Sequence, residues 1–361
     1  MKKTKLLNAF KFKNIEFSNR IVMAPMTRCR AIDNLPNDLM ATYYEQRSSA
    51  GLIITEGNAP SPNGLGYARI PGIFSQEQKI GWKKITDAVH AKGGKIFTQL
   101  MHVGRIAHSA NMPKGSKIMA PSSVSADADM WTDSLGMQKT EVPNEMSLEE
   151  IEFSKNEFVQ AAKNAMEAGF DGVELHAANG YLLEQFLNPN SNIRKDNYGG
   201  SIENRSRFIL ELVQAVGNAI GFDKIGVRIS PYSTFNTMQN YEDIPKTYTY
   251  LTTELSKLNI TYLHLIDYAA RSSSEEGLTL IKDIRNNFKQ LLILNGGYTR
   301  ERAENAIENG ESDLVSFGSS FIANPDLPYR IEHKIEWTKP DTSTFYTADE
   351  KGYIDYPIHQ I

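Results

Sequence analysis

Eight short runs rich in β-branched residues alternate along the chain with segments of helical periodicity. They lie at residues 21–25, 52–56, 95–100, 172–176, 225–230, 260–266, 291–294 and 313–317. This alternation is typical of β-α units in which helices cover a parallel sheet. Eight units favour an α/β fold of the closed (β/α)8 TIM-barrel type, and the open doubly wound sheet is the alternative. A chain of 361 residues suits one barrel with one core.

Several of the helices carry start and stop signals of their own. Ser75 with Gln78, and Ser147 with Glu150, have the spacing of a capping box, in which side chains satisfy the free N–H groups of the first turn. Glycines that can adopt the left-handed turn at a helix end follow three of the helical segments, at Gly169, Gly221 and Gly310.

Two segments depart from the alternation of predicted strands and helices. Residues 101–146 contain three prolines and join the third strand to the next helix, so we expect a lid subdomain inserted after that strand. Residues 340–361 are rich in Tyr and Pro and lack helical periodicity, and we expect them to fold over the barrel mouth. The chain is therefore expected to form one domain, 1–361, with the lid at 101–146.

Charge and composition exclude several classes of partner. Lys and Arg number 39 against 43 Asp and Glu, a net charge of −4, so no basic footprint for nucleic acid is present. No apolar run reaches the length of a membrane span, and Lys11 interrupts the apolar stretch at 6–10. The single cysteine, Cys29, fits a reducing compartment. We expect a cytoplasmic protein without membrane or nucleic-acid partners.

Polar side chains gather where the predicted strands end, which is the end of a barrel that carries the chemistry. They are Thr27, Gln99, His102, His176, Asn179, Tyr181 and Arg228. His176 and Asn179 can donate hydrogen bonds to an oxygen while Tyr181 delivers a proton beside it. The structural alternative is that Asn179-Gly180 makes a turn and that the two rings only pack.

A metal site is a further alternative for the histidines. His102 and His176 could converge, but the sequence shows neither His-Glu-x-x-His nor two histidines with one carboxylate at metal-ligand spacing. We therefore predict that the protein holds no metal ion.

Glycines follow the last two strands, at Gly296, Gly297 and Gly318. Barrels often bind a phosphate at this place, through backbone N–H groups and a helix N-terminus. Simple tight turns are the alternative. A phosphate held there would place a cofactor ring among Thr27, Gln99, Arg228 and the loop after His176, which fits flavin mononucleotide (FMN).

Long ordered motifs resemble the Old Yellow Enzyme family of flavoproteins, in its branch of N-ethylmaleimide and pentaerythritol tetranitrate reductases. They are NRIVMAPMTR (19–28), QLMHVGR (99–105), AGFDGVELHAANGYLLEQFLNPNSNIRKDNYGGSIENR (168–205), IGVRISP (225–231), NGGYT (295–299), FGSSFIANPDL (317–327), and TFY with GYIDYP (344–357). This resemblance covers nearly the whole chain.

The resemblance implies a barrel that binds FMN tightly but without a covalent bond. NADPH or NADH would reduce the flavin, and an electron-poor alkene would reoxidise it in the same site by a ping-pong mechanism. Thr27, Gln99 and Arg228 would contact the flavin ring. Main chain at Ala24, Pro25, Met26 and Gly57 would complete the ring site, and Gly296, Gly297, Gly318 and Ser319 would lie at the phosphate. No Gly-x-Gly-x-x-Gly fingerprint is present, as expected if nicotinamide binds only transiently.

The resemblance also implies the catalytic roles. His176 and Asn179 would bind the carbonyl or nitro oxygen of the substrate, and Tyr181 would protonate the α-carbon. Tyr67, Met101 and Tyr346 would line the substrate channel. The expected substrates are α,β-unsaturated carbonyls, maleimides, nitroalkenes and nitrate esters.

Three residues depart from the pattern or need comment. Met101 stands where this branch commonly has tryptophan, which leaves substrate scope open because methionine is flexible. Ser319 stands where the family usually has an arginine on the phosphate, so we expect weaker FMN binding, with Arg300 or a lysine as the candidate for the missing charge. Cys29 lies two positions after Thr27 and is interpreted as a packing residue.

Two other functions stay open at this point. A flavin-independent TIM-barrel aldolase or isomerase would be colourless, and a non-catalytic FMN-binding protein would be yellow but would not be reduced by nicotinamide. The type of flavoprotein with an added iron–sulfur module is excluded by the single cysteine. The expected assembly is a monomer or a homodimer.

Overall fold

Eight parallel strands form a closed barrel in the computed structural model, which describes residues 4–359. In barrel order they are β3 (Ile21–Met23), β4 (Leu52–Asn58), β5 (Ile96–Leu100), β10 (Gly172–Ala177), β11 (Ile225–Ile229), β12 (Tyr262–Ile266), β13 (Leu291–Asn295) and β14 (Leu314–Phe317). Each predicted run forms one of them, which confirms the TIM barrel and excludes the open sheet. The first run is shorter than predicted: the Ala24 N–H still donates to the Phe317 carbonyl, but Pro25 has no N–H to continue the ladder.

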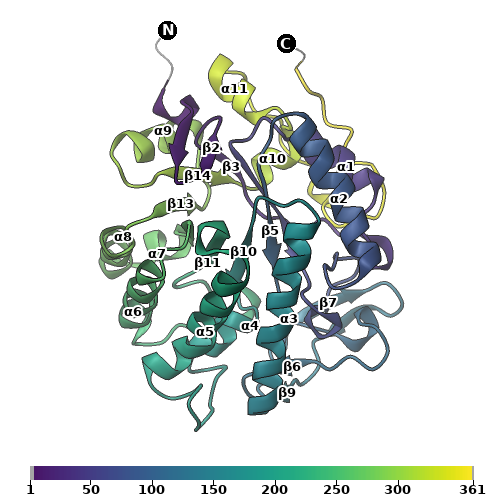
Figure 1. Ribbon diagram of the computed structural model, residues 1–361, viewed down its shortest axis with the longest axis vertical. Coiled ribbons are helices and arrows are strands. Elements are labelled where there is room, and N and C mark those ends of the chain that lie inside the picture. Colours follow the sequence, from purple (N-terminus) through teal and green to yellow (C-terminus); the bar gives the residue numbers. More distant parts are fainter. Residues whose placement is uncertain (1–3, 360–361) are drawn as a thin grey trace.

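Helices surround the barrel (Figure 1). They are α1 (Asp38–Glu45), α2 (Gln76–Ala91), α3 (Leu148–Glu167), α4 (Leu182–Leu187), α5 (Ile202–Ile220), α6 (Ile244–Lys257), α7 (Tyr268–Ser273), α8 (Glu275–Asn287), α9 (Arg300–Glu308), α10 (Ser319–Ala323) and α11 (Leu327–His333). Both predicted capping boxes form, at Ser75 and at Ser147. Within residues 4–359, no helix combines the length and the apolar character needed to cross a bilayer.

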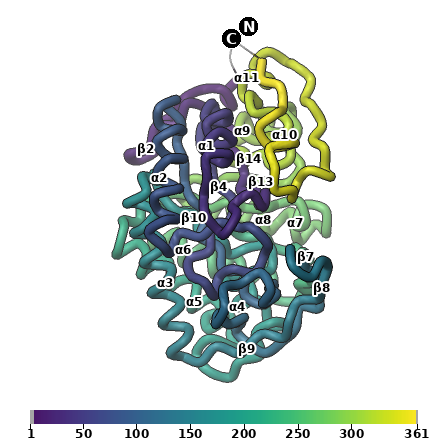
Figure 2. The backbone as a smooth tube through the Cα atoms, turned by 90° about the vertical axis from the view of Figure 1, so that its right-hand side faces the viewer, coloured from purple at the N-terminus to yellow at the C-terminus, as the bar shows by residue number. Residues whose placement is uncertain are grey.

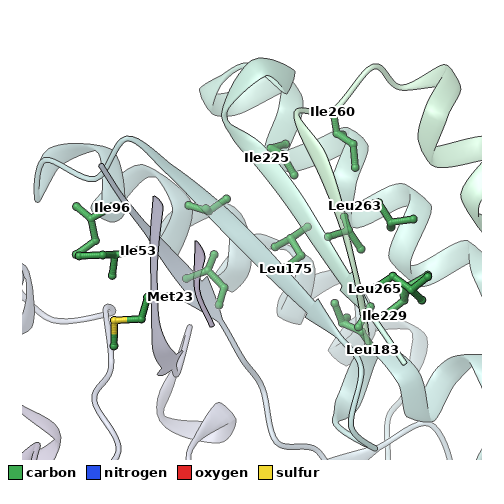
Figure 3. Packing of buried hydrophobic residues seen from close by; sticks show 14 of the residues in the cluster. Met23, Ile53, Ile96, Leu175, Leu183, Ile225, Ile229, Ile260, Leu263 and Leu265 are labelled. Atoms are coloured by element: carbon green, nitrogen blue, oxygen red, sulfur yellow. The ribbon is translucent and has the colours of Figure 1, made fainter. Parts of the chain in front are cut away.

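Apolar side chains of the strands alternate between the helices and the barrel interior. The labelled side chains in Figure 3, such as Ile53, Leu175 and Leu263, belong to the buried core cluster that the strands share with the covering helices. Burying each such side chain stabilises the fold by about 1.5–3 kcal/mol. These contacts make the barrel a rigid support for the loops at its ends.

A hairpin of β1 (Phe10–Phe12) and β2 (Ile15–Phe17) packs against the residues that fill the barrel interior. Among those interior residues, Leu52, Leu291 and Leu314 are the first residues of their strands. The hairpin therefore closes the amino end of the barrel, and the carboxyl ends of the strands are left to carry a site.

Residues 101–146, the predicted lid, form two small sheets. Strands β6 (Met119–Ala120) and β9 (Asn144–Glu145) pair in parallel, and β7 (Asp129–Thr132) and β8 (Gly136–Lys139) form an antiparallel hairpin. A second apolar cluster joins this segment to the barrel mouth, through contacts that include Met101, Met130 and Tyr181. The segment thus helps to bury Tyr181. A lid function for it remains a prediction.

The C-terminal segment is tied to the barrel by buried arginines. Figure 2 shows it in yellow, running beside α10. Arg28 donates to the carbonyls of Phe345 and Gly352, and Arg47 donates to that of Tyr353. Residues 360 and 361 of the predicted segment lie outside the described part of the chain, as do residues 1–3 of the predicted domain. The described part brings Phe345 to the barrel mouth, as expected.

A third buried arginine, Arg30, makes several hydrogen bonds to the C-terminal segment, and its replacement should destabilise the packing of that segment. Its guanidinium donates to the carbonyls of Thr344, Phe345, Asp349 and Lys351. We expect Arg30→Met to lower the free energy of unfolding by about 3 kcal/mol or more, because buried carbonyls lose charged donors. Urea unfolding measures this effect.

Lys83→Met provides the control for Arg30→Met, because it removes an exposed i,i+4 ion pair with Asp87 and should not change the urea midpoint measurably. A wild-type midpoint for Arg30→Met would mean that the segment is held by other contacts.

Candidate active site

A cavity of about 270 Å³ opens at the carboxyl ends of the barrel strands. Its walls come from the loop after β3, the end of β5, the β10–α4 loop, β11, the start of α10 and the C-terminal segment. The lining residues are Pro25, Met26, Thr27, Arg28, Gln99, Met101, His176, Asn179, Tyr181, Arg228, Phe235, Ser319, Ile322, Phe345 and Tyr346. Segments more than 300 residues apart in the sequence therefore meet in one place.

Most of the sequence-predicted site residues line this cavity, but some do not. Those that do not are Ala24, Gly57, Tyr67, Gly296, Gly297 and Gly318. Gly57 is covered by Met101, since a Cβ at Gly57 would lie 2.6 Å from the Met101 sulfur. Gly318 precedes α10, and Gly296 and Gly297 follow β13 with positive φ. These glycines keep their predicted cofactor roles as proposals.

Gln99 and Arg228 give the cavity a polar, charged floor. Both are buried, and Arg228 Nη2 donates to Asn295 Oδ1 at 3.0 Å. Arg228 Nε has no hydrogen-bond partner within residues 4–359. A buried cation with an unpaired donor beside an amide and the Thr27 hydroxyl suits the oxygens and nitrogens of a heterocyclic ring that gains negative charge on reduction. The residues present therefore fit FMN.

The loop after β10 is fixed by its own backbone hydrogen bonds. Asn179 has φ +58° and Gly180 φ +74°, so the chain turns sharply between β10 and α4. The Asn179 N–H donates to Ser230 Oγ at 2.8 Å, and its carbonyl accepts from Asn236 Nδ2 at 2.8 Å. The Asn179 side chain is left free of this framework and lines the cavity beside His176.

His176 is a neutral donor in this setting. Burial, reinforced by the positive charge of Arg228, holds the pKa of its imidazole well below the usual value. Its Nδ1 is buried without a hydrogen-bond partner in the part of the chain that the structure describes. A neutral imidazole has one N–H to donate, so His176 and Asn179 together can polarise one oxygen.

Tyr181 stands against His176, with ring centroids 5.0 Å apart. Its hydroxyl lies 3.1 Å from that of Tyr67 in a hydrogen bond, which is how Tyr67 reaches the site without lining the cavity. Burial raises the pKa of the Tyr181 phenol above its usual value of about 10, so the hydroxyl is protonated at neutral pH. Tyr181 can therefore act as a proton donor next to the two oxygen-binding groups.

Four lining residues were not predicted from the sequence: Arg28, Phe235, Ile322 and Phe345. Phe235 lies in the loop after β11 and is largely exposed, so the rule that chemistry sits after strand ends was a signal that could have found it. Phe345 adjoins the predicted Tyr346. Arg28 adjoins the predicted Thr27, so the same rule could have found it. Ile322 carried no local signal, because only the folded chain brings it to the cavity.

Two other sequence candidates lie outside the cavity. His102 is buried, its Nδ1 accepts from the Gly104 N–H at 3.1 Å, and burial lowers its pKa to about 3. Cys29 is buried, and burial raises the pKa of its thiol to about 12, which suits the predicted packing role. Among residues 4–359, no three His, Cys, Asp or Glu side chains are grouped so as to hold a metal ion.

A buried carboxyl group, that of Glu184 on α4, holds the β10–α4 loop by hydrogen bonds. It accepts from the Gly180 N–H at 2.6 Å, from Ser230 Oγ at 2.9 Å and from the Tyr248 hydroxyl at 2.7 Å. Burial outweighs these donors and raises the pKa of Glu184 to about 7. Because Ser230 also bonds Asn179, Glu184 connects the loop to β11 and α6.

This raised pKa predicts a pH dependence of stability. Between about pH 4.5 and 7 the folded protein holds a proton on Glu184 that the unfolded chain releases, so stability falls as pH rises, by roughly 3 kcal/mol across the window. We expect Glu184→Gln to show a smaller fall in urea midpoint between pH 5 and 7.5.

The matched control is Glu149→Gln, which removes an exposed carboxylate and should keep the wild-type fall in midpoint. An unreduced fall in Glu184→Gln would show that this group does not titrate in the window. Burial likewise raises the pKa of Glu56 and Glu157 to about 7, so some pH dependence persists in every variant.

Comparisons with known proteins agree with this geometry. Residues 5–337 match the model of the NADH:flavin oxidoreductase / NADH oxidase family. The chain is 43% identical over 348 residues to the "Probable flavin mononucleotide-dependent alkene reductase" of Leishmania infantum, covering 94% of each chain. It is 40% identical over 377 residues to 12-oxophytodienoate reductase 7 of Oryza sativa subsp. japonica, covering 99% of this chain and 95% of the relative.

Solved structures agree with these relatives. Morphinone reductase in complex with tetrahydroNAD superimposes with a TM-score of 0.94 at 39% identity, covering 99% of this chain and 98% of the other. Family match, relatives and fold agree over nearly the full length, and they confirm the Old Yellow Enzyme resemblance of the sequence motifs. The chain belongs to the NADH:flavin oxidoreductase / NADH oxidase family, among the flavoproteins of the Old Yellow Enzyme type.

Proposed function

We propose that this protein is an FMN-dependent ene-reductase, which oxidises NADPH or NADH and reduces the activated C=C bond of a small electron-poor alkene. One observation carries the proposal: the neutral His176 and the Asn179 side chain line the same cavity as the protonated Tyr181 and the buried cation Arg228. Two relatives, one described as an alkene reductase and one as an oxophytodienoate reductase, support the same chemistry.

Residues on the cavity floor would hold the cofactor. Thr27, Gln99 and Arg228 would contact the ring, with main chain at 24–26 and Gly57 beside it. Gly296, Gly297, Gly318 and Ser319 would lie at the phosphate, at the ends of β13 and β14. When bound, FMN supplies the hydride for the alkene after accepting one from nicotinamide.

The side chains of the β10–α4 loop would carry out the rest of the reaction. His176 and Asn179 donate hydrogen bonds to the substrate's carbonyl or nitro oxygen and draw electron density from the double bond. Tyr181 gives its phenolic proton to the α-carbon, and its raised pKa keeps that proton in place until a strongly basic carbon forms. Tyr67, hydrogen-bonded to Tyr181, orients the hydroxyl.

The channel walls would set substrate scope. Met101 is flexible and covers Gly57, while Tyr346 at the rim is largely exposed. We extend the proposed substrates to α,β-unsaturated carbonyls, maleimides, nitroalkenes and nitrate esters. Residues 101–146 would act as a lid over Tyr181, because Met101 and Met130 share its apolar cluster.

A single anaerobic titration, followed by visible spectroscopy, tests the proposed function. The visible spectrum of the purified protein is recorded alone, after NADPH or NADH, and after 2-cyclohexenone. We expect yellow colour that bleaches with nicotinamide and returns with the enone. Colourless protein that stays colourless after incubation with FMN would support a flavin-independent aldolase or isomerase, and yellow protein that nicotinamide cannot bleach would support a non-catalytic FMN-binding protein.

Ser319 provides a separate prediction about cofactor affinity. It lines the cavity at the start of α10 and offers no charge to a phosphate, and Arg300, the candidate for the missing charge, opens α9. We expect Ser319→Arg to slow FMN dissociation about tenfold, because a bidentate charged contact is worth roughly 1.5 kcal/mol or more. Release of FMN fluorescence on dilution measures the rate.

Ser320→Arg is the matched control for Ser319→Arg, because it adds the same charge at a residue that does not line the cavity. Equal dissociation rates for wild type and Ser319→Arg would show that the serine does not weaken binding.

A further inference from the structure

A network of buried polar side chains begins at Gln99 and continues inside the barrel. Glu174 Oε1 accepts from Gln99 Nε2 at 2.8 Å, and Glu174 Oε2 lies 2.9 Å from His264 Nδ1. His264 Nε2 lies 2.8 Å from Ser316 Oγ. Glu174 and His264 have no solvent-exposed side-chain surface. None of the roles proposed above uses this Glu174–His264–Ser316 network.

Strand register explains how these residues meet. Glu174 on β10 is paired with Gln99 on β5, and His264 on β12 is paired with Arg228 on β11. Between β10 and β12, the residue level with Glu174 is Gly226, where a Cβ would lie 2.1 Å from the Tyr262 ring. The absence of a side chain at Gly226 leaves room for the Tyr262 ring. Glu174 and His264, from the non-adjacent strands β10 and β12, meet inside the barrel.

The network fixes which end of the Gln99 amide faces the cavity. An ionised carboxylate only accepts hydrogen bonds, so the Gln99 NH₂ group must point to Glu174. The Gln99 backbone is held as well, since its N–H donates to Thr55 Oγ1 at 3.3 Å. Gln99 therefore presents its carbonyl oxygen as an acceptor to whatever ring N–H lies in the cavity.

The charges of the network are also defined. Burial alone would raise the pKa of Glu174, but His264, Arg228 and Gln99 hold it below the usual value, so the carboxylate is ionised. Burial lowers the pKa of His264, which leaves a neutral ring whose Nδ1–H donates to Glu174 and whose Nε2 accepts from Ser316. One fixed negative charge thus lies near the cation of Arg228.

We infer that Glu174, held by His264, is a positioning residue for the cofactor: it orients the Gln99 carbonyl toward the ring and offsets the positive charge of Arg228. The inference rests on the proposed function, because it concerns the FMN that the cavity would hold. A negative charge close to the ring disfavours the electron-rich reduced form, so Glu174 lowers the reduction potential that Arg228 raises.

Glu174→Gln tests both parts of this role. The substitution keeps the volume, removes the charge and gives Gln99 a partner that no longer fixes its amide. We expect FMN to bind at least tenfold more weakly in the oxidised state. We also expect the ratio of oxidised to reduced dissociation constants to rise at least tenfold, which is about 30 mV for a two-electron couple. Spectroelectrochemistry and fluorescence titration give these values without any turnover.

The matched control is Glu157→Gln, which removes a half-buried carboxylate on α3, outside the barrel, and should change neither value. A merely structural Glu174 would lower the urea midpoint but leave the potential and the flavin spectrum at wild-type values, and that result would overturn the inference. Wild-type protein that binds no FMN would overturn the proposed function and the inference with it.

His264 keeps the inference testable if Glu174→Gln does not fold. In His264→Leu the carboxyl group loses its donor and takes up a proton, so potential and affinity should shift in the same direction as for Glu174→Gln. His264→Gln restores an N–H donor and should bring both values back within about threefold of wild type. Equal values for His264→Leu and wild type would contradict the inference.

Discussion

We expect replacement of Tyr181 with phenylalanine to leave the bleaching of the flavin by nicotinamide at its wild-type rate and to slow the return of colour with an enone by about 10²–10⁴-fold. A positioned general acid contributes a factor of this size. Reduction of the flavin by nicotinamide needs no proton from this phenol. Only the rate of the alkene half-reaction should therefore fall. Stopped-flow spectra of the two half-reactions, recorded separately, measure the difference.

Tyr67→Phe is the matched control for this variant. It removes the hydroxyl 3.1 Å from that of Tyr181 but keeps the ring packing, so the alkene half-reaction should slow by less than tenfold. Equal loss of both half-reactions in Tyr181→Phe would contradict the role of proton donor and indicate a damaged flavin site. In the wild-type protein, the rate of the alkene half-reaction should be independent of pH from 6 to 9, because burial keeps the Tyr181 phenol protonated in this range.

Replacing His176 or Asn179, the proposed donors to the substrate oxygen, should also slow alkene reduction. The cause would be the loss of polarisation of the substrate and not the loss of a proton donor. We expect His176→Ala and Asn179→Gly each to lower the rate of alkene reduction by about 10²–10³-fold, the size found when one oxyanion donor is lost. Glycine is the better choice at Asn179 because φ is +58° there, which alanine would adopt only with strain. Spectral titration with a non-reactive phenol or enone gives the matching loss of affinity.

His176→Asn tests whether His176 acts as a hydrogen-bond donor. It keeps a side-chain N–H, so its rate of alkene reduction should be much higher than that of His176→Ala. FMN affinity should stay near wild type in all these variants, because neither side chain is assigned to the ring. If a variant carrying both His176→Ala and Asn179→Gly reduced an enone at the wild-type rate, the substrate oxygen would have to be bound elsewhere in the cavity.

The barrel could be predicted because its signals are local. Each strand is a short run of β-branched residues, and capping boxes at Ser75 and Ser147 mark the starts of two helices. The end of β3 was placed two residues too late, since the pattern of apolar residues continues to Pro25, which has no N–H for the ladder. Hydrogen-bond pairing, not composition, decides where a strand stops.

The site was predictable where it follows strand ends and was not where distant segments enter it. Gln99, His176 and Arg228 lie on strands or at their ends, so the barrel rule finds them. Phe345 reaches the cavity only because buried arginines hold the C-terminal segment by its carbonyls, and no local pattern reports such contacts.

The sequence by itself determined the barrel and the family and supplied the candidate site residues, because periodicity and motif order are properties of neighbouring residues. Only the tertiary structure decided which of those residues share one cavity, that the Tyr67 hydroxyl contacts that of Tyr181, and that Glu174 joins Gln99 to His264. These facts depend on strand register and on side chains that meet across the barrel, so burial and long-range hydrogen bonds, which have no fixed sequence spacing, set them.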